Sequence, residues 1–104
     1  MKKSYRKFTE LLDEYFKDEV FAAEFLSQTL EEEELNTFLM SLKDVIRVHG
    51  SLNSIAKKCN LSRSTLYNLF SEKKNPEMKT IITLLHVLGY ELKVAKKSTV
   101  QRAA

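Results

Sequence analysis

The sequence predicts an all-α fold, a bundle of short helices, and three observations support this prediction. Apolar residues recur at intervals of three and four residues along most of the chain, which is the periodicity of helices that bury one face. Residues that break helices are few, since the 104 residues include only two glycines and one proline. The window from Leu52 to Ser71 has the spacing of two short helices joined by a tight turn. A chain of this length forms one domain with a modest core.

Three amphipathic helices are expected before that window. The first covers residues 4–17, and the second follows Asp18, whose carboxylate can accept hydrogen bonds from the first backbone N–H groups. The third runs from about Glu32 to His49 and ends at Gly50, where we expect a left-handed residue. Their apolar faces consist of Phe8, Leu11, Leu12 and Tyr15 in the first helix, Phe21, Ala22, Phe25, Leu26 and Leu30 in the second, and Leu35, Phe38, Leu39, Leu42, Val45 and Ile46 in the third.

The window Leu52–Ser71 fits a helix-turn-helix. In its first helix the small Ala56 lets the second helix approach closely. Asn60 occupies the turn position that usually needs positive φ, and asparagine tolerates that geometry best among the non-glycine residues. Leu61 fills the corner, and Ser62 can cap the second helix through its hydroxyl. The apolar residues of the second helix, which we expect to face the core, are Leu66, Leu69 and Phe70.

The outer face of this second helix carries side chains that suit the major groove of DNA. Arginine can bond to guanine in bidentate fashion, asparagine can bond to adenine, and serine or threonine can bond to bases or phosphates. The N-terminal part of such a recognition helix meets the base edges. The alternative is an ordinary helical hairpin with a polar outer face, but the matched spacing favours DNA binding. The candidate base-reading residues are Arg63, Ser64, Tyr67 and Asn68, and the candidate phosphate contacts are Asn53, Ser62, Thr65, Lys73 and Lys74.

A helix and a short β-strand are expected to follow. Pro76 suits the first turn of the helix, whose apolar face is Met78, Ile81, Ile82, Leu85 and Leu88 and whose end is Gly89. Apolar and polar residues then alternate with the period of a strand, which has no partner in an all-helical chain. Because an unpaired strand edge is a liability, we expect it to pair with the same strand of a second copy. The residues predicted for this dimerisation are Tyr90, Leu92 and Val94.

These elements give three regions. Residues 1–31 form an N-terminal helical extension, residues 32–97 form the helix-turn-helix domain with its C-terminal strand, and residues 98–104 form a flexible polar tail.

Charge is distributed unevenly between the two halves. Residues 1–50 carry a formal charge of −4 and residues 51–104 carry +7. The basic half contains the helix-turn-helix, as contact with DNA phosphates requires. The acidic half suits a basic partner. The alternative is that Glu31–Glu34 only begin a helix, where acidic side chains complement the dipole.

Other classes of function find little support. Cys59 is the only cysteine, His49 and His86 are isolated, and there is no glycine-rich phosphate loop, so neither catalysis, a metal site nor a cofactor is expected. His49 fits a packed helix end, and Cys59 fits a small buried apolar residue. Uncharged stretches are too short to span a membrane, and the N-terminus lacks the apolar segment of a signal peptide. A cytoplasmic location is expected.

Residues 55–94, IAKKCNLSRSTLYNLFSEKKNPEMKTIITLLHVLGYELKV, resemble the Cro/repressor-type helix-turn-helix of HigA-like addiction-module antidote proteins. The preceding segment FAAEFLSQTLEEEELNTFLMSLKDVIRVHG is similar to the acidic helices of that family, so the resemblance spans roughly residues 8–95. The matching residues are Leu61-Ser62-Arg63, Leu66-Tyr67, Asn75-Pro76, Thr80, Leu85 and Leu88-Gly89. The departures are Asn60, where the turn usually has glycine, and Lys73–Lys74 in the loop.

The resemblance implies a lambda-repressor-like fold and a DNA-binding antitoxin of a type II toxin–antitoxin system. Such proteins act as dimers on a palindromic operator, repress their own operon, and neutralise a small basic toxin similar to the RelE/HigB ribosome-dependent ribonucleases. One alternative is a stand-alone phage-type repressor without a toxin. Another is a protein-interaction module that has lost DNA binding, which the intact polar face of residues 63–68 disfavours.

Overall fold

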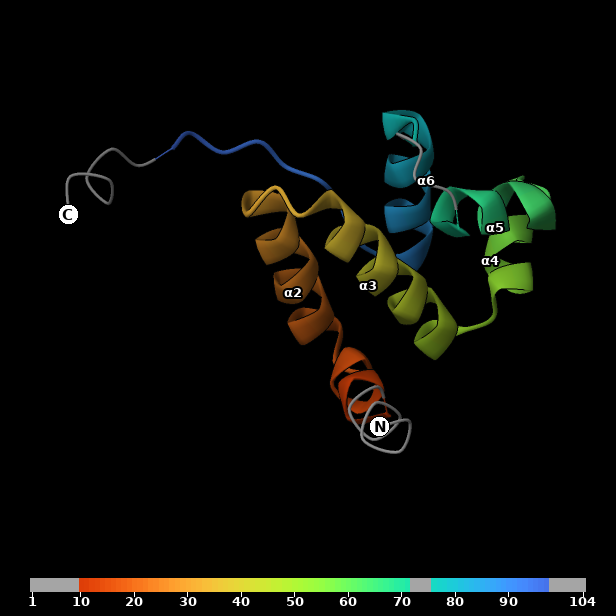
Figure 1. Ribbon diagram of the computed structural model, residues 1–104, viewed down its shortest axis with the longest axis horizontal. Helices are drawn as coiled ribbons and strands as arrows, with labels where there is room; N and C mark the ends of the chain where they lie inside the picture. The colour runs from red at the N-terminus through yellow and green to blue at the C-terminus, as the bar shows by residue number, and fades with distance from the viewer. Residues whose placement is uncertain (1–9, 72–75, 98–104) are drawn as a thin grey trace.

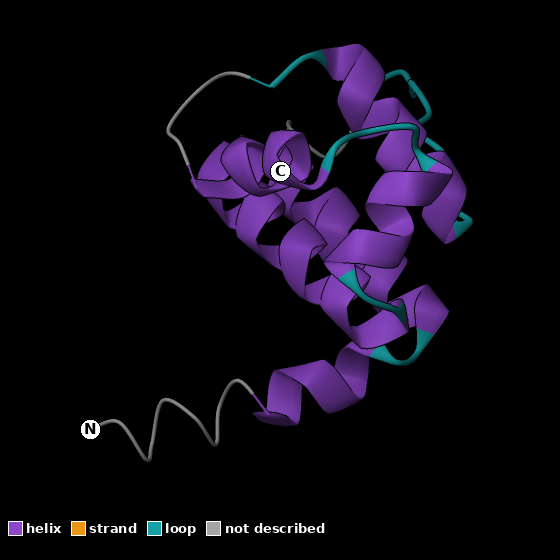
Figure 2. Cartoon of the chain, turned by 90° about the vertical axis from the view of Figure 1, so that its right-hand side faces the viewer, coloured by secondary structure: helices purple, strands orange, loops and turns teal. Residues whose placement is uncertain are grey.

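The computed structural model describes residues 10–71 and 76–97, and within them the fold is all-α (Figure 1). Residues 10–16 are helical, and the labelled helices are α2 (Glu19–Glu31), α3 (Leu35–His49), α4 (Leu52–Lys58), α5 (Arg63–Ser71) and α6 (Met78–Leu88). Figure 2 shows only helices and loops in this part of the chain. The prediction of the all-α class is confirmed. Phe8, Lys73, Lys74 and the expected tail, residues 98–104, lie outside the described residues.

The prediction of a β-strand at Tyr90–Val94 is wrong, because the described residues contain no strand there. Residues 90–97 continue from α6 without helix or strand, and they leave the helical body as an extended arm (Figure 1). A strand exists only as part of a hydrogen-bonded ladder, and the described chain has no second strand to pair with. The alternation of Tyr90, Leu92 and Val94 therefore gives an extended backbone but no sheet.

Hydrogen bonds at the helix ends explain where α2 and α3 begin and end. The Asp18 carboxylate accepts hydrogen bonds from the backbone N–H groups of Val20 and Phe21 at 2.9 and 3.2 Å, which confirms it as the cap of α2. Glu33 then takes a left-handed conformation with φ 57°. This turn ends α2, so α3 begins at Leu35 and not at Glu32 as the sequence indicated.

Three further predictions at helix ends had mixed outcomes. Gly89 ends α6, as predicted, and it has a left-handed conformation with φ 96°. Gly50 follows the end of α3 but has φ 167°, so the expected left-handed geometry is wrong there and the backbone is extended. Pro76 lies two residues before α6 and not in its first turn, because α6 begins only after Glu77.

The core is one cluster to which every described helix contributes. α3 packs against α2 and also against α4 and α5, and α6 packs against α4. Phe16, Ala22 and Leu26 from the expected N-terminal extension join the same cluster as residues of the following helices. Several residues predicted to face the core are instead exposed, because the neighbouring helices do not cover them; these are Leu11, Tyr15, Leu30, Leu35 and Met78.

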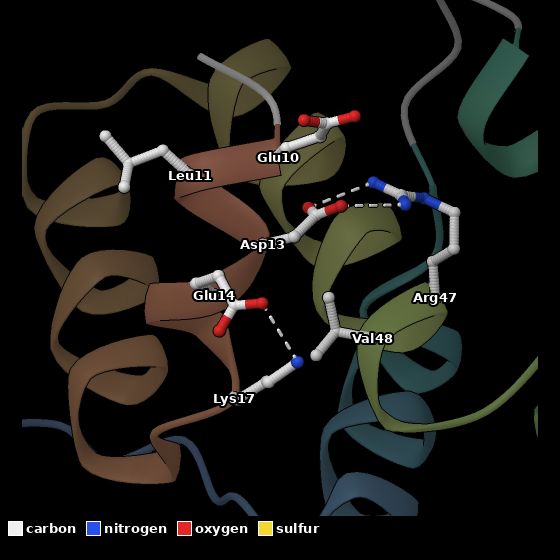
Figure 3. A pocket seen from close by; sticks show the side chains of 7 residues that line it. All are labelled: Glu10, Leu11, Asp13, Glu14, Lys17, Arg47 and Val48. Atoms are coloured by element: carbon white, nitrogen blue, oxygen red, sulfur yellow. Dashed lines mark hydrogen bonds and ion pairs between the residues drawn. The ribbon is translucent and has the colours of Figure 1, made fainter. Parts of the chain in front are cut away.

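The N-terminal helical segment is held on α3 by a polar contact (Figure 3). Arg47 donates hydrogen bonds from its two terminal nitrogens to the Asp13 carboxylate at 3.0 and 3.2 Å, and to Asp44 at 2.8 Å. These hydrogen bonds, with Asp13 first, raise the pKa of Arg47 above its usual value. His49 lies at the end of α3, as predicted, and its Nε2 is 3.0 Å from the Phe16 carbonyl oxygen.

Candidate nucleic-acid interface

The connection between α4 and α5 is built by backbone hydrogen bonds around Asn60. Asn60 has φ 61°, which confirms the left-handed turn predicted for it. The Leu61 N–H donates to the Ala56 carbonyl at 2.9 Å, and the Asn60 N–H donates to the Lys57 carbonyl at 3.1 Å. This pair of bonds is the Schellman pattern that ends many helices. It reverses the chain within three residues, so that α5 packs on α4.

Both helices of this unit have side-chain caps at their N-termini. In α4, Ser51 and Ser54 form a capping box, in which each hydroxyl accepts a hydrogen bond from the backbone N–H of the other residue. In α5, the Ser62 hydroxyl accepts from the Thr65 N–H at 3.1 Å and donates to the Thr65 hydroxyl at 2.7 Å. The predicted cap at Ser62 is confirmed. Ser62 and Thr65, both expected to contact phosphate, are thus bonded to each other in this structure.

The inner side of the unit is apolar and fixes its orientation. Ile55 and Ala56 of α4 and Leu66 of α5 are buried in the core, while Leu69 and Phe70 pack against the cluster and are partly buried. Cys59 is also partly buried, and this desolvation raises the pKa of its thiol. A thiol with a raised pKa is a poor nucleophile at neutral pH, which agrees with a packing role.

The outer side brings together the four candidate base-reading residues. All four are exposed, and they line one open hollow on the surface of α5: Arg63, Ser64, Tyr67 and Asn68. The Arg63 guanidinium carbon lies 5.4 Å from the centre of the Tyr67 ring. Asn53 is exposed on the first turn of α4. The spacing of α5 therefore places the four predicted side chains on one accessible face.

All charged side chains of the α4–α5 unit are basic. From residue 51 to residue 71 the sequence has three basic residues and no acidic one. Besides Arg63 these are Lys57 and Lys58, which are exposed in the last turn of α4, just before the turn to α5. Neither lysine is among the DNA-binding residues predicted from the sequence. Their position beside Asn60 is the signal that could have identified them.

The residues predicted for dimerisation do not share one environment. Tyr90 is partly buried against the core, whereas Val94 is fully exposed. Tyr90 and Leu92 border a hollow that is also lined by residues of α2, α3 and α6, among them the apolar Leu26, Leu30 and Phe38. Leu92 is partly accessible at this hollow. The start of the C-terminal arm is thus packed on the body, and its later part is free.

The described residues include neither a cluster of metal-ligating side chains nor a helix that could span a membrane. Within residues 10–71 and 76–97, no three histidine, cysteine or carboxylate side chains gather in a way that could hold a metal ion. In the same part of the chain, every helix is too short or too polar to cross a bilayer.

The fold and the site together define a small all-α protein whose distinguishing surface is the polar face of a short, capped helix. Residues 6–96 match the family described as "probable addiction module antidote protein", and the chain belongs to this family. The match confirms the addiction-module antidote part of the resemblance seen in the sequence. Comparison with curated proteins and with solved structures gave no significant match.

Proposed function

We propose that the chain is a sequence-specific DNA-binding antitoxin of the HigA-like type, which represses its own operon and neutralises a RelE/HigB-like toxin. The observation that carries the DNA-binding part is the exposed hollow of α5. Four side chains able to bond to base edges line it, and the surrounding unit has basic residues and no acidic one from residue 51 to residue 71. Membership in an antidote family supports the antitoxin part.

In this proposal α4 and α5 form a helix-turn-helix of the Cro/repressor type. α5 lies in the major groove and its first two turns meet the base edges. Arg63, Ser64, Tyr67 and Asn68 face the bases. Asn53, Ser62, Thr65, Lys73 and Lys74 contact the phosphates on either side, and the Thr65 hydroxyl can still do so while Ser62 donates to it.

We also infer that the protein acts as a homodimer on a palindromic operator, through the C-terminal arm. Tyr90, Leu92 and Val94 alternate with charged residues, and Val94 has no cover in the single chain. If two arms lie antiparallel about Leu92, Tyr90 of one copy stands opposite Val94 of the other. The same symmetry places Glu91 of each copy opposite Lys93 of the other copy. The order of apolar and charged residues along the arm is therefore complementary to itself.

We propose that the toxin binds to the acidic side of the molecule, on α2. α2 carries exposed Glu24 and Glu31, which border a shallow surface next to the apolar hollow between α2 and the arm. A basic partner with an apolar anchor fits such a surface, since Glu24 and Glu31 lie beside a hollow that is partly lined by apolar residues. Figure 1 places α2 and α5 on opposite sides of α3, so toxin and DNA would not compete for one face.

A binding titration tests the DNA-binding part. The full chain is titrated by fluorescence anisotropy against the DNA upstream of its own gene and against a scrambled duplex. Arg63→Ala should weaken binding to the upstream DNA by about 1–3 kcal/mol with little effect on the scrambled duplex. Lys74→Ala is the matched control, because loss of a phosphate contact should weaken both and flatten the salt dependence. Equal weakening of both duplexes by Arg63→Ala would contradict base reading.

Co-purification with the product of the adjacent reading frame tests the antitoxin part. A Glu24→Lys/Glu31→Lys double variant should lose that protein, while Lys57→Glu, on the opposite side, should retain it. DNA binding without any such partner would favour the alternative of a stand-alone phage-type repressor.

A further inference from the structure

We propose that Tyr67 is a positioning residue that holds the Arg63 side chain for recognition of one guanine in the operator. This inference rests on the DNA-binding function proposed above. It changes the role of Tyr67, which the sequence placed among the residues that read bases directly.

The geometry gives the Arg63 side chain one partner in the described structure. Arg63 is the first residue of α5 and Tyr67 lies four residues later, so one turn of helix stacks the two side chains. The guanidinium carbon is 5.4 Å from the ring centre, within the range of a cation–π contact. Among the described residues, the ion pairs of the protein involve other cations, namely Lys17, Arg47 and Lys93. The aromatic ring is therefore what orients Arg63.

The stacked arrangement suits guanine for a physical reason. A free arginine side chain samples many rotamers, and part of this entropy is lost when it makes a fixed contact. Stacking on the ring restricts the guanidinium plane before DNA arrives and leaves the N–H groups at its edge available. Those groups match the O6 and N7 acceptors of guanine in the major groove. Restricting the guanidinium of Arg63 before DNA binds thus favours guanine, because guanine presents two acceptors side by side in the major groove.

The stacking partner has to be a ring, but the hydroxyl of Tyr67 has no part in this role. Phenylalanine at this position keeps the face on which the guanidinium lies. Leucine keeps an apolar side chain of similar bulk but removes the π face. The Tyr67 side chain is 38% exposed, so neither change disturbs a tightly packed site.

Selection from a random-sequence DNA library tests the pair without knowledge of the operator. The full-length wild type, Arg63→Ala, Tyr67→Leu and Tyr67→Phe are each used to select duplexes, and the base preference at every position is compared. We expect a guanine in the wild-type site that Arg63→Ala no longer prefers. Tyr67→Leu should reduce the same preference by about two- to fivefold, the effect of an exposed cation–π contact. Tyr67→Phe should restore it. Combining Tyr67→Leu with Arg63→Ala should add no further loss at that position.

Three results would overturn the proposal. The first is an unchanged guanine preference in Tyr67→Leu. The second is a changed preference at a position that Arg63→Ala does not affect, which would make Tyr67 a direct reader. The third is a Tyr67→Phe variant that behaves like Tyr67→Leu, which would assign the effect to the hydroxyl. Circular dichroism of each variant establishes that it is folded. Failure of the wild type to select any site would instead contradict the proposed DNA-binding function itself.

Discussion

Within residues 10–71 and 76–97, three single residues with positive φ end helices: Glu33, Asn60 and Gly89. The last two could be predicted, because glycine and asparagine are the residues that tolerate left-handed backbone. Glu33 could not, since a glutamate within an acidic run is typical of a helix and gives no turn signal. Its conformation follows from the hydrogen bonds around it, where the Glu34 N–H donates to the Thr29 carbonyl at 2.9 Å.

Glu33→Gly should therefore stabilise the protein. A left-handed conformation costs a residue with a Cβ atom about 1–2 kcal/mol, and glycine avoids this cost but loses more entropy on folding. We expect a net gain of about 1 kcal/mol in the free energy of unfolding, measured by urea denaturation. Glu24→Gly, in the interior of α2, is the matched control and should lose about 1 kcal/mol. A loss at both positions would contradict the strain assigned to Glu33.

Tyr90→Phe should also stabilise the protein, and its effect should depend on pH. The Tyr90 hydroxyl is buried and has no hydrogen-bond partner in the described structure, so removing it should gain about 1 kcal/mol. Desolvation, followed by the charges of Glu19 and Asp18, raises the pKa of Tyr90 above its usual value of 10.0. Compared with its ionised form, the neutral phenol favours the folded state, so this part of the stability is fully present below pH 10 and is lost as pH rises through the folded-state pKa.

Urea denaturation between pH 7 and pH 11 measures both effects. Tyr90→Phe should remove part of the decline in stability above pH 10. Tyr15→Phe is the control, because Tyr15 is exposed, and it should change neither the stability at neutral pH nor the decline. If Tyr90→Phe and the wild type had identical pH profiles, ionisation of Tyr90 would not be a cause of the decline in stability above pH 10.

At the scale of elements, the sequence predicted where the helices lie better than where they begin. The apolar periodicity of α2 to α6 is set by packing, so it is visible in the sequence. The start of α3 depends on particular turn hydrogen bonds at Glu33 and Glu34, which periodicity does not report. The strand was predicted from alternation alone, but Tyr90–Val94 has no neighbouring strand in the part of the chain that the structure describes. The face of α5 was predictable because Leu66 and Leu69 fix which side of the helix is inside.

Ser62→Ala should test the cap that positions α5. Loss of the hydroxyl removes the hydrogen bond from the Thr65 N–H, and N-cap serines contribute about 1 kcal/mol. We expect urea denaturation to show a loss of about this size. Ser64→Ala, two residues later on the exposed face, should change stability by less than about 0.5 kcal/mol. Equal effects of the two substitutions would mean that Ser62 does not cap α5.

At the scale of the whole molecule, the charge difference between the two halves of the sequence becomes a difference between two sides. α3 lies in the middle, with the acidic α2 on one side and the α4–α5 unit on the other (Figure 1). The sequence predicted the charges but not this separation, which depends on the packing of α3 against both. It also gave no sign of the Arg63–Tyr67 stack, because rotamers are set by the local environment and not by spacing alone.

Charge reversal on the C-terminal arm tests the self-complementary dimer. Glu91→Lys should raise the dimer dissociation constant about tenfold, because the two-fold symmetry creates two like-charge pairs, each costing up to about 1 kcal/mol. Lys93→Glu should do the same, and the double reversal should restore the wild-type value. Sedimentation equilibrium measures this constant, with Lys57→Glu as a control on another surface. Single and double variants that all match the wild type would place the dimer interface elsewhere.

The most direct test of the account is NMR mapping of the DNA-binding surface. The ¹⁵N-labelled full chain is titrated with a duplex from upstream of its own gene, and the shift of each backbone amide signal is followed. We expect the largest shifts from Ser62 to Asn68, on the first two turns of α5, and unchanged signals on α2. Largest shifts on α2, or no shifts at a saturating concentration of the duplex, would contradict it.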